Sequence, residues 1–400
     1  MKVNEVVIVG GGIAGISCAV TLAENNIQAT LIEQNNFVGG NTTSGLLSTW
    51  RGFNSTKVND KFLQDVINSS VKSGISKGVV PDPSGISPYL FSYHPDYFKD
   101  ILIEYLNINK VKIRLNTKVV SVDISNKKIK SVSTSEDGIQ QNVKSKLFID
   151  ATGNGNIATL CGVKKIASTQ TAVYRIRISG VNKNILREHL ISHPLDSSIP
   201  IESLRKNLLS FCGFAESARK WYSKNNSLLR LDGFDIDEIP NSDEIIITMF
   251  AYNYNSSEGN SFSTCITNSR MLLPEAIQFL KNELPGFADC YISSVANTLG
   301  FVNSEQLNSE IVLTDADVML GKFFADSIGE SLLPSQKNIK LQVPGKSIFV
   351  NDVSNLLVIG RTILPSLAFY KNGNPLLTMQ LGKAAGINAI GILEKMENET

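Results

Sequence analysis

The chain opens with an apolar run, residues 6–9, that is typical of a buried strand. Small and apolar residues continue from residue 13 as a helix, and a second short strand is expected at residues 28–33. A strand, a helix and a second strand in this order predict the first β-α-β unit of a Rossmann-like parallel sheet.

In the next part of the chain, segments without a regular hydrophobic pattern alternate with segments that have one. Residues 46–92 are rich in Ser, Gly and Pro and predict an excursion with one short helix at 60–73. Pro95 then opens a helix whose apolar residues recur at helical spacing. From residue 111 short alternating runs predict a β-meander that leads into a returning strand at 147–150.

The middle of the chain mixes strands and helices and lacks any glycine fingerprint. Its predicted elements are strands at 171–179 and 244–252 and helices around 201–222 and 270–284. Near the end, a buried-type strand at 355–359 precedes a helix at 376–393 that is rich in Gly and Ala. The expected fold class is α/β, with a Rossmann-like domain formed by residues 1–165 together with 345–400. Residues 166–344 are expected to form a second, α+β domain.

Composition narrows the class of protein. The 400 residues are 42% hydrophobic and carry 38 basic against 37 acidic side chains, a net charge of +1. Because the charges balance and no run of Lys or Arg occurs, the sequence indicates no positively charged surface for binding nucleic acid or an anionic membrane. The five cysteines include no C-x-x-C pair, and no motif supplies a third ligand beside the histidines. We therefore expect no metal site.

The apolar stretch at residues 6–23 has a second reading, as a signal peptide or a membrane span. Four glycines in it and the adjoining Glu5 favour a buried βα unit instead. We therefore expect a cytoplasmic protein without a membrane span.

A glycine motif lies between the first strand and the first helix. Gly10, Gly12 and Gly15 form G-x-G-x-x-G, and Glu33 follows eighteen residues later at the end of the second strand. The glycines allow a tight turn, close approach of phosphates and close helix packing, while the acid accepts ribose hydroxyls. The motif predicts a nucleotide pyrophosphate site, for which NAD and a larger two-part cofactor are rival ligands.

Two further glycine segments separate these ligands. Gly39 and Gly40 lie in a polar turn, NNFVGGNTTSG, which either is an ordinary surface turn or passes close to the pyrophosphate of a two-part cofactor. The returning strand ends in DATGNG, where Gly153 places flexible backbone at the carboxyl end of a parallel strand. A plain NAD site does not account for these segments and the Gly-rich terminal helix together.

The motifs GGGIAG with Glu33, DATGNG, and NLLVIGR followed by GKAAGINA resemble the two-dinucleotide-binding-domain flavoproteins with a glutathione-reductase-like FAD fold. The chain is more narrowly similar to the FAD-dependent oxidoreductase family, through VGGNTTSG, HPDYFKDIL, VYRIRISGV, LPGFADCYI and VLTDADVMLGKFFADSI. The resemblance implies FAD as cofactor, with residues 1–165 and 345–400 as the FAD-binding domain and 166–344 as a substrate or cap domain.

Carried over to this sequence, the resemblance assigns cofactor contacts to seven stretches. The pyrophosphate and adenosine end involves Gly10, Gly12, Ile13, Ala14, Gly15, Glu33, Gln34, Gly39, Gly40, Asn41, Thr42 and Thr43. Adenine meets the backbone of Val119, and Ala151, Thr152 and Gly153 line the cofactor. The ribityl or pyrophosphate region meets Gly360 and Arg361, and the flavin pyrimidine edge faces Gly373, Asn374, Pro375 and Leu376.

The chain departs from the family pattern where substrate groups are expected. Val302, Glu305 and Gln306 stand where the family carries basic residues, and TILPSLAFYKNGNP replaces a segment that commonly has a His and an Arg. Candidate catalytic residues are then Lys371, Tyr370 and His94. The alternatives are a solvated loop lysine for Lys371 and a structural or exposed histidine for His94. Arg51 is either a binder of anionic substrate or an ion-pairing residue.

The expected activity is hydride transfer from a C–N, C–O or C–C bond of a small organic substrate to flavin N5. Electrons then pass to oxygen or a separate acceptor. The alternatives are a flavin monooxygenase served by an external reductase and a non-catalytic FAD-binding subunit. A halogenase is disfavoured because the W-x-W-x-I-P signature is missing.

Overall fold

The structure, a computed structural model, describes residues 4–168, 170–206, 208–225, 232–254, 262–333, 336–369 and 373–398. It forms two compact units, each built from separate stretches of the chain. Unit 1 comprises Met1–Gly40, Lys99–Ser168 and Asn303–Thr400, and unit 2 comprises Asn41–Phe98 and Thr169–Val302.

The units divide the chain differently from the domains expected from sequence. Residues 303–344 group with unit 1, and residues 41–98 group with unit 2. Which stretches act as FAD-binding domain and which as substrate domain stays a prediction.

The core of unit 1 is a five-stranded, wholly parallel sheet in the order β21-β10-β1-β2-β6. Its strands are β1 (Asn4–Val9), β2 (Ala29–Ile32), β6 (Lys112–Arg114), β10 (Ser145–Asp150) and β21 (Leu356–Val358). Continuous apolar runs suit strands that are covered on both faces, and Val6, Val7 and Ile8 are fully buried. The predicted Rossmann-like sheet is confirmed.

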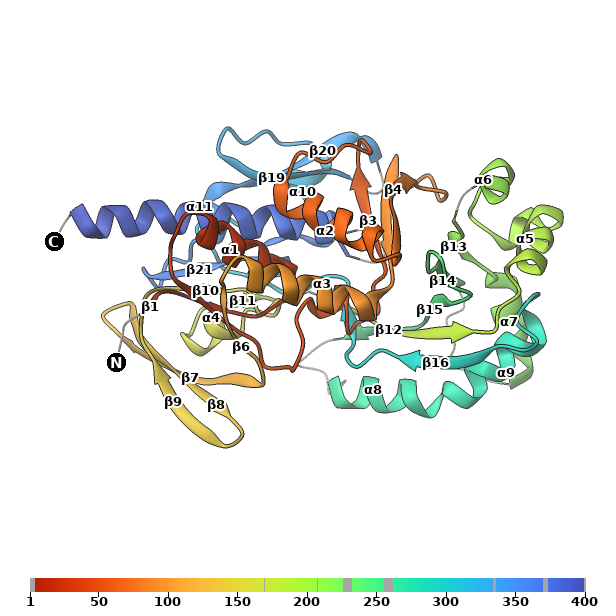
Figure 1. Cartoon of the computed structure of the whole chain (residues 1–400), viewed down its shortest axis with the longest axis horizontal. Helices are drawn as coiled ribbons and strands as arrows, with labels where there is room; N and C mark the ends of the chain where they lie inside the picture. Colours follow the sequence, from red (N-terminus) through yellow and green to blue (C-terminus); the bar gives the residue numbers. More distant parts are fainter. Residues whose placement is uncertain are drawn as a thin grey trace. The chain divides into compact units, whose positions relative to one another are not determined.

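A separate three-stranded antiparallel sheet forms the crossover between β6 and β10 (Figure 1). It consists of β7 (Thr117–Ser125), β8 (Lys128–Glu136) and β9 (Ile139–Val143), which confirms the predicted meander.

Helices α1 (Ile13–Glu24) and α11 (Pro375–Asn398) pack on each other beside the parallel sheet (Figure 1). The remaining elements of unit 1 are short, apart from α3, which begins in unit 2. They are α3 (Pro95–Ile108), α4 (Asn156–Leu160), β11 (Lys165–Ile166), β18 (Gln306–Leu307), α10 (Asp315–Met319), β19 (Ser327–Leu333), β20 (Gln336–Pro344), η3 (Gly345–Ile348), η4 (Arg361–Ile363) and η5 (Ser366–Ala368).

Helix α11 is long and apolar enough to cross a membrane by length and composition alone. Half of its apolar window is buried within the structure, as is usual for the core helix of a globular protein.

Unit 2 contains two antiparallel sheets. The larger has the order β13-β14-β15-β12-β16, with β17 also paired to β12, and the smaller has the order β3-β5-β4. The strands are β3 (Thr49–Phe53), β4 (Ser76–Pro81), β5 (Tyr89–Tyr93), β12 (Gln170–Ser179), β13 (Ser210–Gly213), β14 (Phe234–Glu238), β15 (Ile245–Tyr254), β16 (Tyr291–Val295) and β17 (Gly300–Phe301). One face of the larger sheet is apolar and includes Tyr174, Ile176, Ile236 and Ile247.

The helices of unit 2 come mainly from the middle of the chain. They are α2 (Lys61–Lys72), α5 (Lys183–Ser192), α6 (Ile201–Lys206), α7 (Ala215–Asn225), α8 (Phe262–Met271) and α9 (Leu273–Glu283), with the 3-10 turns η1 (Gly40–Thr42), at the unit boundary, and η2 (Pro194–Asp196).

Two sequence-based expectations about unit 2 are wrong in detail. The helical segment expected around 201–222 is interrupted by β13, because Phe211 is buried in the core while the strand pairs with β14. The excursion at 46–92 contains the whole β3-β5-β4 sheet in addition to the predicted helix. Trp50, Phe91 and Tyr93 are fully buried there, so aromatic packing stabilises strands that their short sequences did not reveal.

Candidate cofactor-binding site

The turn between β1 and α1 requires glycine at Gly10 and Gly15 for reasons internal to the fold. Gly10 has φ +111°, and a Cβ there would collide with the Ala151 carbonyl at the end of β10. A Cβ at Gly15 would collide with the Gly10 carbonyl. These two glycines let the helix and two strands approach one another closely.

Gly12 is different, because its missing side chain faces open space. It is the N-cap of α1, with φ −73° and ψ 175°, and a Cβ at this position would meet nothing within 4 Å. None of the described side chains caps this end of the helix. The space therefore lies where helix amides and the helix dipole favour an anion.

The second glycine pair lies against the first. Gly39 has φ +96° and donates its backbone N–H to the Gly11 carbonyl at 2.7 Å, and it forms a parallel bridge with Gly12. Gly40, φ +55°, is so placed that a Cβ would lie 3.7 Å from the Cα of Gly12. Gly39 and Gly40 thus border the turn between β1 and α1, and their contact with a cofactor stays a prediction.

Glu33 follows β2 and is held by backbone and side-chain donors. Its Oε2 accepts the Gly11 N–H at 2.7 Å, and its Oε1 accepts the backbone N–H of Asn35 at 2.9 Å and the Asn35 amide at 2.6 Å. The carboxylate is buried, and Oε2, which accepts a single bond, retains acceptor capacity. Its assigned role as the acceptor of ribose hydroxyls stays a prediction.

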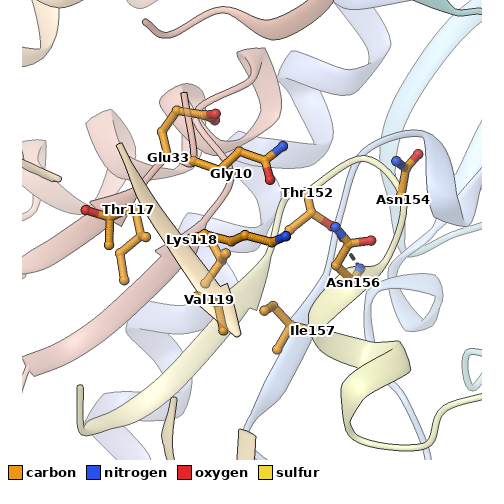
Figure 2. A pocket seen from close by; sticks show the side chains of 12 residues that line it. Gly10, Glu33, Thr117, Lys118, Val119, Thr152, Asn154, Asn156 and Ile157 are labelled. Atoms are coloured by element: carbon orange, nitrogen blue, oxygen red, sulfur yellow. Dashed lines mark hydrogen bonds between the residues drawn. The ribbon is translucent and has the colours of Figure 1, made fainter. Parts of the chain in front are cut away.

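Gly10 and Glu33 line a cavity of about 90 Å³ in unit 1 (Figure 2). The lining includes Gly10, Glu33, Gln34, Val119 and Thr152, which the sequence assigned to the cofactor. It also includes residues that sequence reasoning missed: Val9, Ile32, Thr117, Lys118, Asn154, Asn156 and Ile157. Their positions beside Val119 and within or after DATGNG were the available signal.

Asp150 organises the loop at the carboxyl end of β10. Its Oδ1 accepts the backbone N–H and hydroxyl of Thr152 at 3.0 and 2.6 Å, and its Oδ2 accepts the Ala158 N–H of α4 at 2.9 Å. Burial raises the pKa of the Asp150 carboxyl, while these donors lower it. The carboxylate therefore holds the loop that presents Thr152 to the cavity.

Arg361 meets the same loop from the end of β21. Its Nη2 donates to Asn154 Oδ1 at 2.7 Å, and a Cβ on Gly153 would lie 3.3 Å from its guanidinium carbon. Burial lowers the pKa of Arg361 to about 10, so the group stays cationic at neutral pH. Gly360 precedes it with φ +90°, which favours glycine at this corner.

The start of α11 is built as a capped helix N-terminus. Asn374 Oδ1 accepts the Leu377 N–H at 3.1 Å and its amide donates to the Ala368 carbonyl at 2.9 Å, while Pro375 begins the helix and Leu376 follows. Gly373 has φ +95°. Tyr370 and Lys371, two of the catalytic candidates, lie outside the described residues.

Ile13 and Ala14 are buried at the first turn of α1, next to Gly12. Within unit 2, Asn41 donates its amide to the Phe301 carbonyl at 3.0 Å, and the Thr42 carbonyl accepts the Tyr93 hydroxyl at 2.9 Å. Thr42 and Thr43 are buried. The roles assigned to these residues stay predictions.

His94, the third catalytic candidate, belongs to an ionic cluster in unit 2. Its Nε2 lies 3.2 Å from Glu244 Oε2 and 3.2 Å from Arg177 Nη1, and Arg177 also pairs with Asp96. Burial first, and then the Arg177 charge, lower the pKa of His94. A neutral His held between charged partners fits its structural alternative as well as a catalytic role.

The residues that depart from the family pattern make local contacts. The Gln306 amide donates to the Leu313 carbonyl at 2.8 Å, and Glu305 lies 3.9 Å from the Lys165 ammonium. Among the described residues, no group of three His, Cys, Asp or Glu side chains is placed to hold a metal ion.

Comparison with known proteins identifies the family. The family described as FAD dependent oxidoreductase matches residues 5–395. No curated protein sequence matches the chain.

Several solved structures share the fold of this chain at low sequence identity. A p-nitrophenol 4-monooxygenase from Pseudomonas putida DLL-E4 is 12% identical with a TM-score of 0.55, over 99% of this chain and 82% of that one. A geranylgeranyl bacteriochlorophyll reductase-like protein from Thermoplasma acidophilum is 13% identical with a TM-score of 0.53, over 100% and 80%. L-proline dehydrogenase from P. horikoshii is 12% identical with a TM-score of 0.50, over 98% and 94%. At these identities the likeness shows the fold alone.

Proposed function

We propose a reaction for this chain, which belongs to the FAD dependent oxidoreductase family: oxidation of a small organic substrate at a C–N, C–O or C–C bond. When bound, FAD supplies the redox chemistry by accepting a hydride from the substrate at N5. The substrate also loses a proton, and the electrons then pass to oxygen or to another acceptor.

The observation that carries the proposal is the open space in front of Gly12. Gly10 and Gly15 are glycine because the protein itself would collide with a side chain, but nothing in the described structure occupies the space a Cβ of Gly12 would enter. With Gly39 alongside and Glu33 lining the adjacent cavity, this geometry fits a pyrophosphate and an adenosine ribose.

In the proposed reaction, this chain's residues bind and orient. The amides at the start of α1 and the guanidinium of Arg361 would hold the phosphates, and Glu33 would accept the ribose hydroxyls. The N-terminus of α11, capped by Asn374, would face the flavin and favour negative charge on the reduced ring.

Two measurements test the proposal. The purified chain should contain FAD or bind it when it is added, and protein that does neither would sink the proposal. Under anaerobic conditions, flavin absorbance should bleach with at least one class of substrate in a panel of amines, amino acids and hydroxy acids. A flavin that no organic substrate or NAD(P)H reduces would favour a non-catalytic FAD-binding subunit.

A flavin monooxygenase is the second candidate. It is favoured by the middle of the chain, which carries no second glycine fingerprint for an NAD(P)H domain, so that an external reductase would be needed. Oxygen consumption that requires both NAD(P)H and a separate reductase, with no bleaching by substrate alone, would support this candidate over the first.

A further inference from the structure

Lys118 is the one residue among the twelve that line the unit 1 cavity to carry a positive charge, and Glu33 is the one to carry a negative charge. Lys118 is the second residue of β7, directly before Val119, and its backbone is fixed by pairing with Ser135 of β8. Both cavity charges therefore come from elements of the same unit.

The Lys118 side chain extends into the cavity. Figure 2 shows it pointing toward Thr152 and Asn156 on the facing wall. Within the part of the chain that the structure describes, its ammonium makes no hydrogen bond or ion pair. Its neighbour Thr117, by contrast, is buried and donates its hydroxyl to the Leu115 carbonyl at 2.8 Å.

The position of this charge matches a phosphate better than a nucleobase. Gly10, the first residue of the phosphate turn, lines the same cavity, so the ammonium and the turn face one space. Glu33 is the acceptor suited to ribose hydroxyls, whereas an ammonium has only donors to offer. A flexible lysine stem carries a point charge that suits phosphate oxygens.

We propose that Lys118 is an additional cofactor-binding residue whose ammonium pairs with the phosphates of the ADP half of FAD. This inference rests on the proposed function. Lys118 should make the chain bind ADP more tightly than adenosine, because adenosine has the ribose and base but no phosphate charge. The contribution is that of a solvent-exposed ion pair, about 2- to 5-fold in affinity at low ionic strength.

The test uses the full chain stripped of FAD, with FAD, ADP and adenosine as the probes. Lys118→Met keeps the apolar stem but removes the charge, and it should weaken FAD and ADP about 2- to 5-fold while leaving adenosine unchanged. Lys118→Arg should retain the preference for ADP. The wild-type advantage should shrink as salt is raised, because exposed charges are screened.

The matched control is Lys112→Met, which removes an exposed charge from β6 outside the cavity lining and should bind all three probes like wild type. Equal binding of FAD and ADP by Lys118→Met and wild type would overturn the inference and leave the proposed function standing. A parallel loss for adenosine would also overturn it, because packing would then explain the effect. A wild-type chain that binds no FAD would overturn the proposed function itself.

Discussion

Gly12 and Gly15 belong to one motif, yet the structure gives them separate tasks that substitution can separate. A Cβ on Gly12 meets nothing within 4 Å, and its φ of −73° suits any residue. We therefore expect Gly12→Ala to keep the unfolding free energy of the FAD-free chain within about 0.5 kcal/mol of wild type. FAD affinity should fall at least about tenfold, or about 1.4 kcal/mol, because the methyl group occupies the phosphate space.

Gly15→Ala is the matched variant for this measurement. Its Cβ collides with the Gly10 carbonyl, so denaturant unfolding should show a loss of about 1–3 kcal/mol even without FAD. If Gly12→Ala binds FAD as tightly as wild type, the space in front of Gly12 does not hold the phosphates.

The sequence left two roles open for Arg51, binding an anionic substrate or pairing with acidic side chains, and the structure shows its contacts. Its Nε lies 3.2 Å from Asp82 Oδ2, and its Nη2 donates to Ser210 Oγ at 2.5 Å and lies 3.7 Å from Asp237 Oδ1. The Arg51 and Asp237 side chains are 7% exposed and that of Asp82 is fully buried. The ion-pairing alternative is therefore the one these contacts support.

This network predicts a large stability effect. Arg51→Met leaves buried carboxylates without their cation and should lower the unfolding free energy by about 3–5 kcal/mol, measured by urea denaturation. Arg205→Met, at an exposed position of α6, should change it by less than about 0.5 kcal/mol. A loss below about 1 kcal/mol for Arg51→Met would mean that the buried carboxylates bind protons or water at little cost.

At the scale of elements, α11 was predictable because its small residues lie where it packs closely on another helix. The Gly and Ala residues indicated close contact with another backbone, and the structure extends the expected 376–393 to Pro375–Asn398. A Cβ on Gly382 would collide with the Ala14 carbonyl of α1, and one on Gly386 would contact Thr21. Strand β13 was not predictable, because its four residues carry too short a pattern to outweigh the helical signal around them.

Two glycines of α11 allow a paired prediction. Gly382→Ala should destabilise the chain by about 1–3 kcal/mol, because α11 must move away from α1. Gly391→Ala has no neighbour within 4 Å and should stabilise it by about 0.5–1 kcal/mol through helix propensity. Thermal unfolding of both variants provides the comparison, and equal effects would show that the helices do not pack closely at Gly382.

At the scale of the whole molecule, the parallel sheet, the meander and the glycine turns followed from local sequence patterns. The division into units did not, because it depends on contacts between distant stretches. Arg51 of β3, for example, donates to Ser210 Oγ of β13 at 2.5 Å, a contact that joins residues 41–98 to residues 169–302 within unit 2. Lys118 was missed for a similar reason: β7 and the loop after β10 are distant in the sequence, and the fold brings them to the wall of one cavity.

The pH dependence of global stability provides a last test. His94 is surrounded by Arg177, Glu244, Asp96 and Tyr97, and its pKa lies below the ordinary value of 6.5 because burial and Arg177 disfavour its charged form. As pH falls through 6.5, the unfolded chain therefore binds a proton that the folded chain does not. The contribution of His94 is fully present above this pH and should be lost progressively as pH falls below it.

His94→Gln should accordingly flatten the decline in unfolding free energy between pH 7 and 5, measured by urea denaturation at each pH. His193→Gln removes an exposed histidine from the same unit and provides the control for a general effect of losing a histidine. A His94→Gln profile as steep as that of wild type would mean that Glu244 and Asp96 favour protonation as strongly as burial and Arg177 oppose it. The acid sensitivity would then belong to other groups, and the His94 cluster would act through its hydrogen bonds alone.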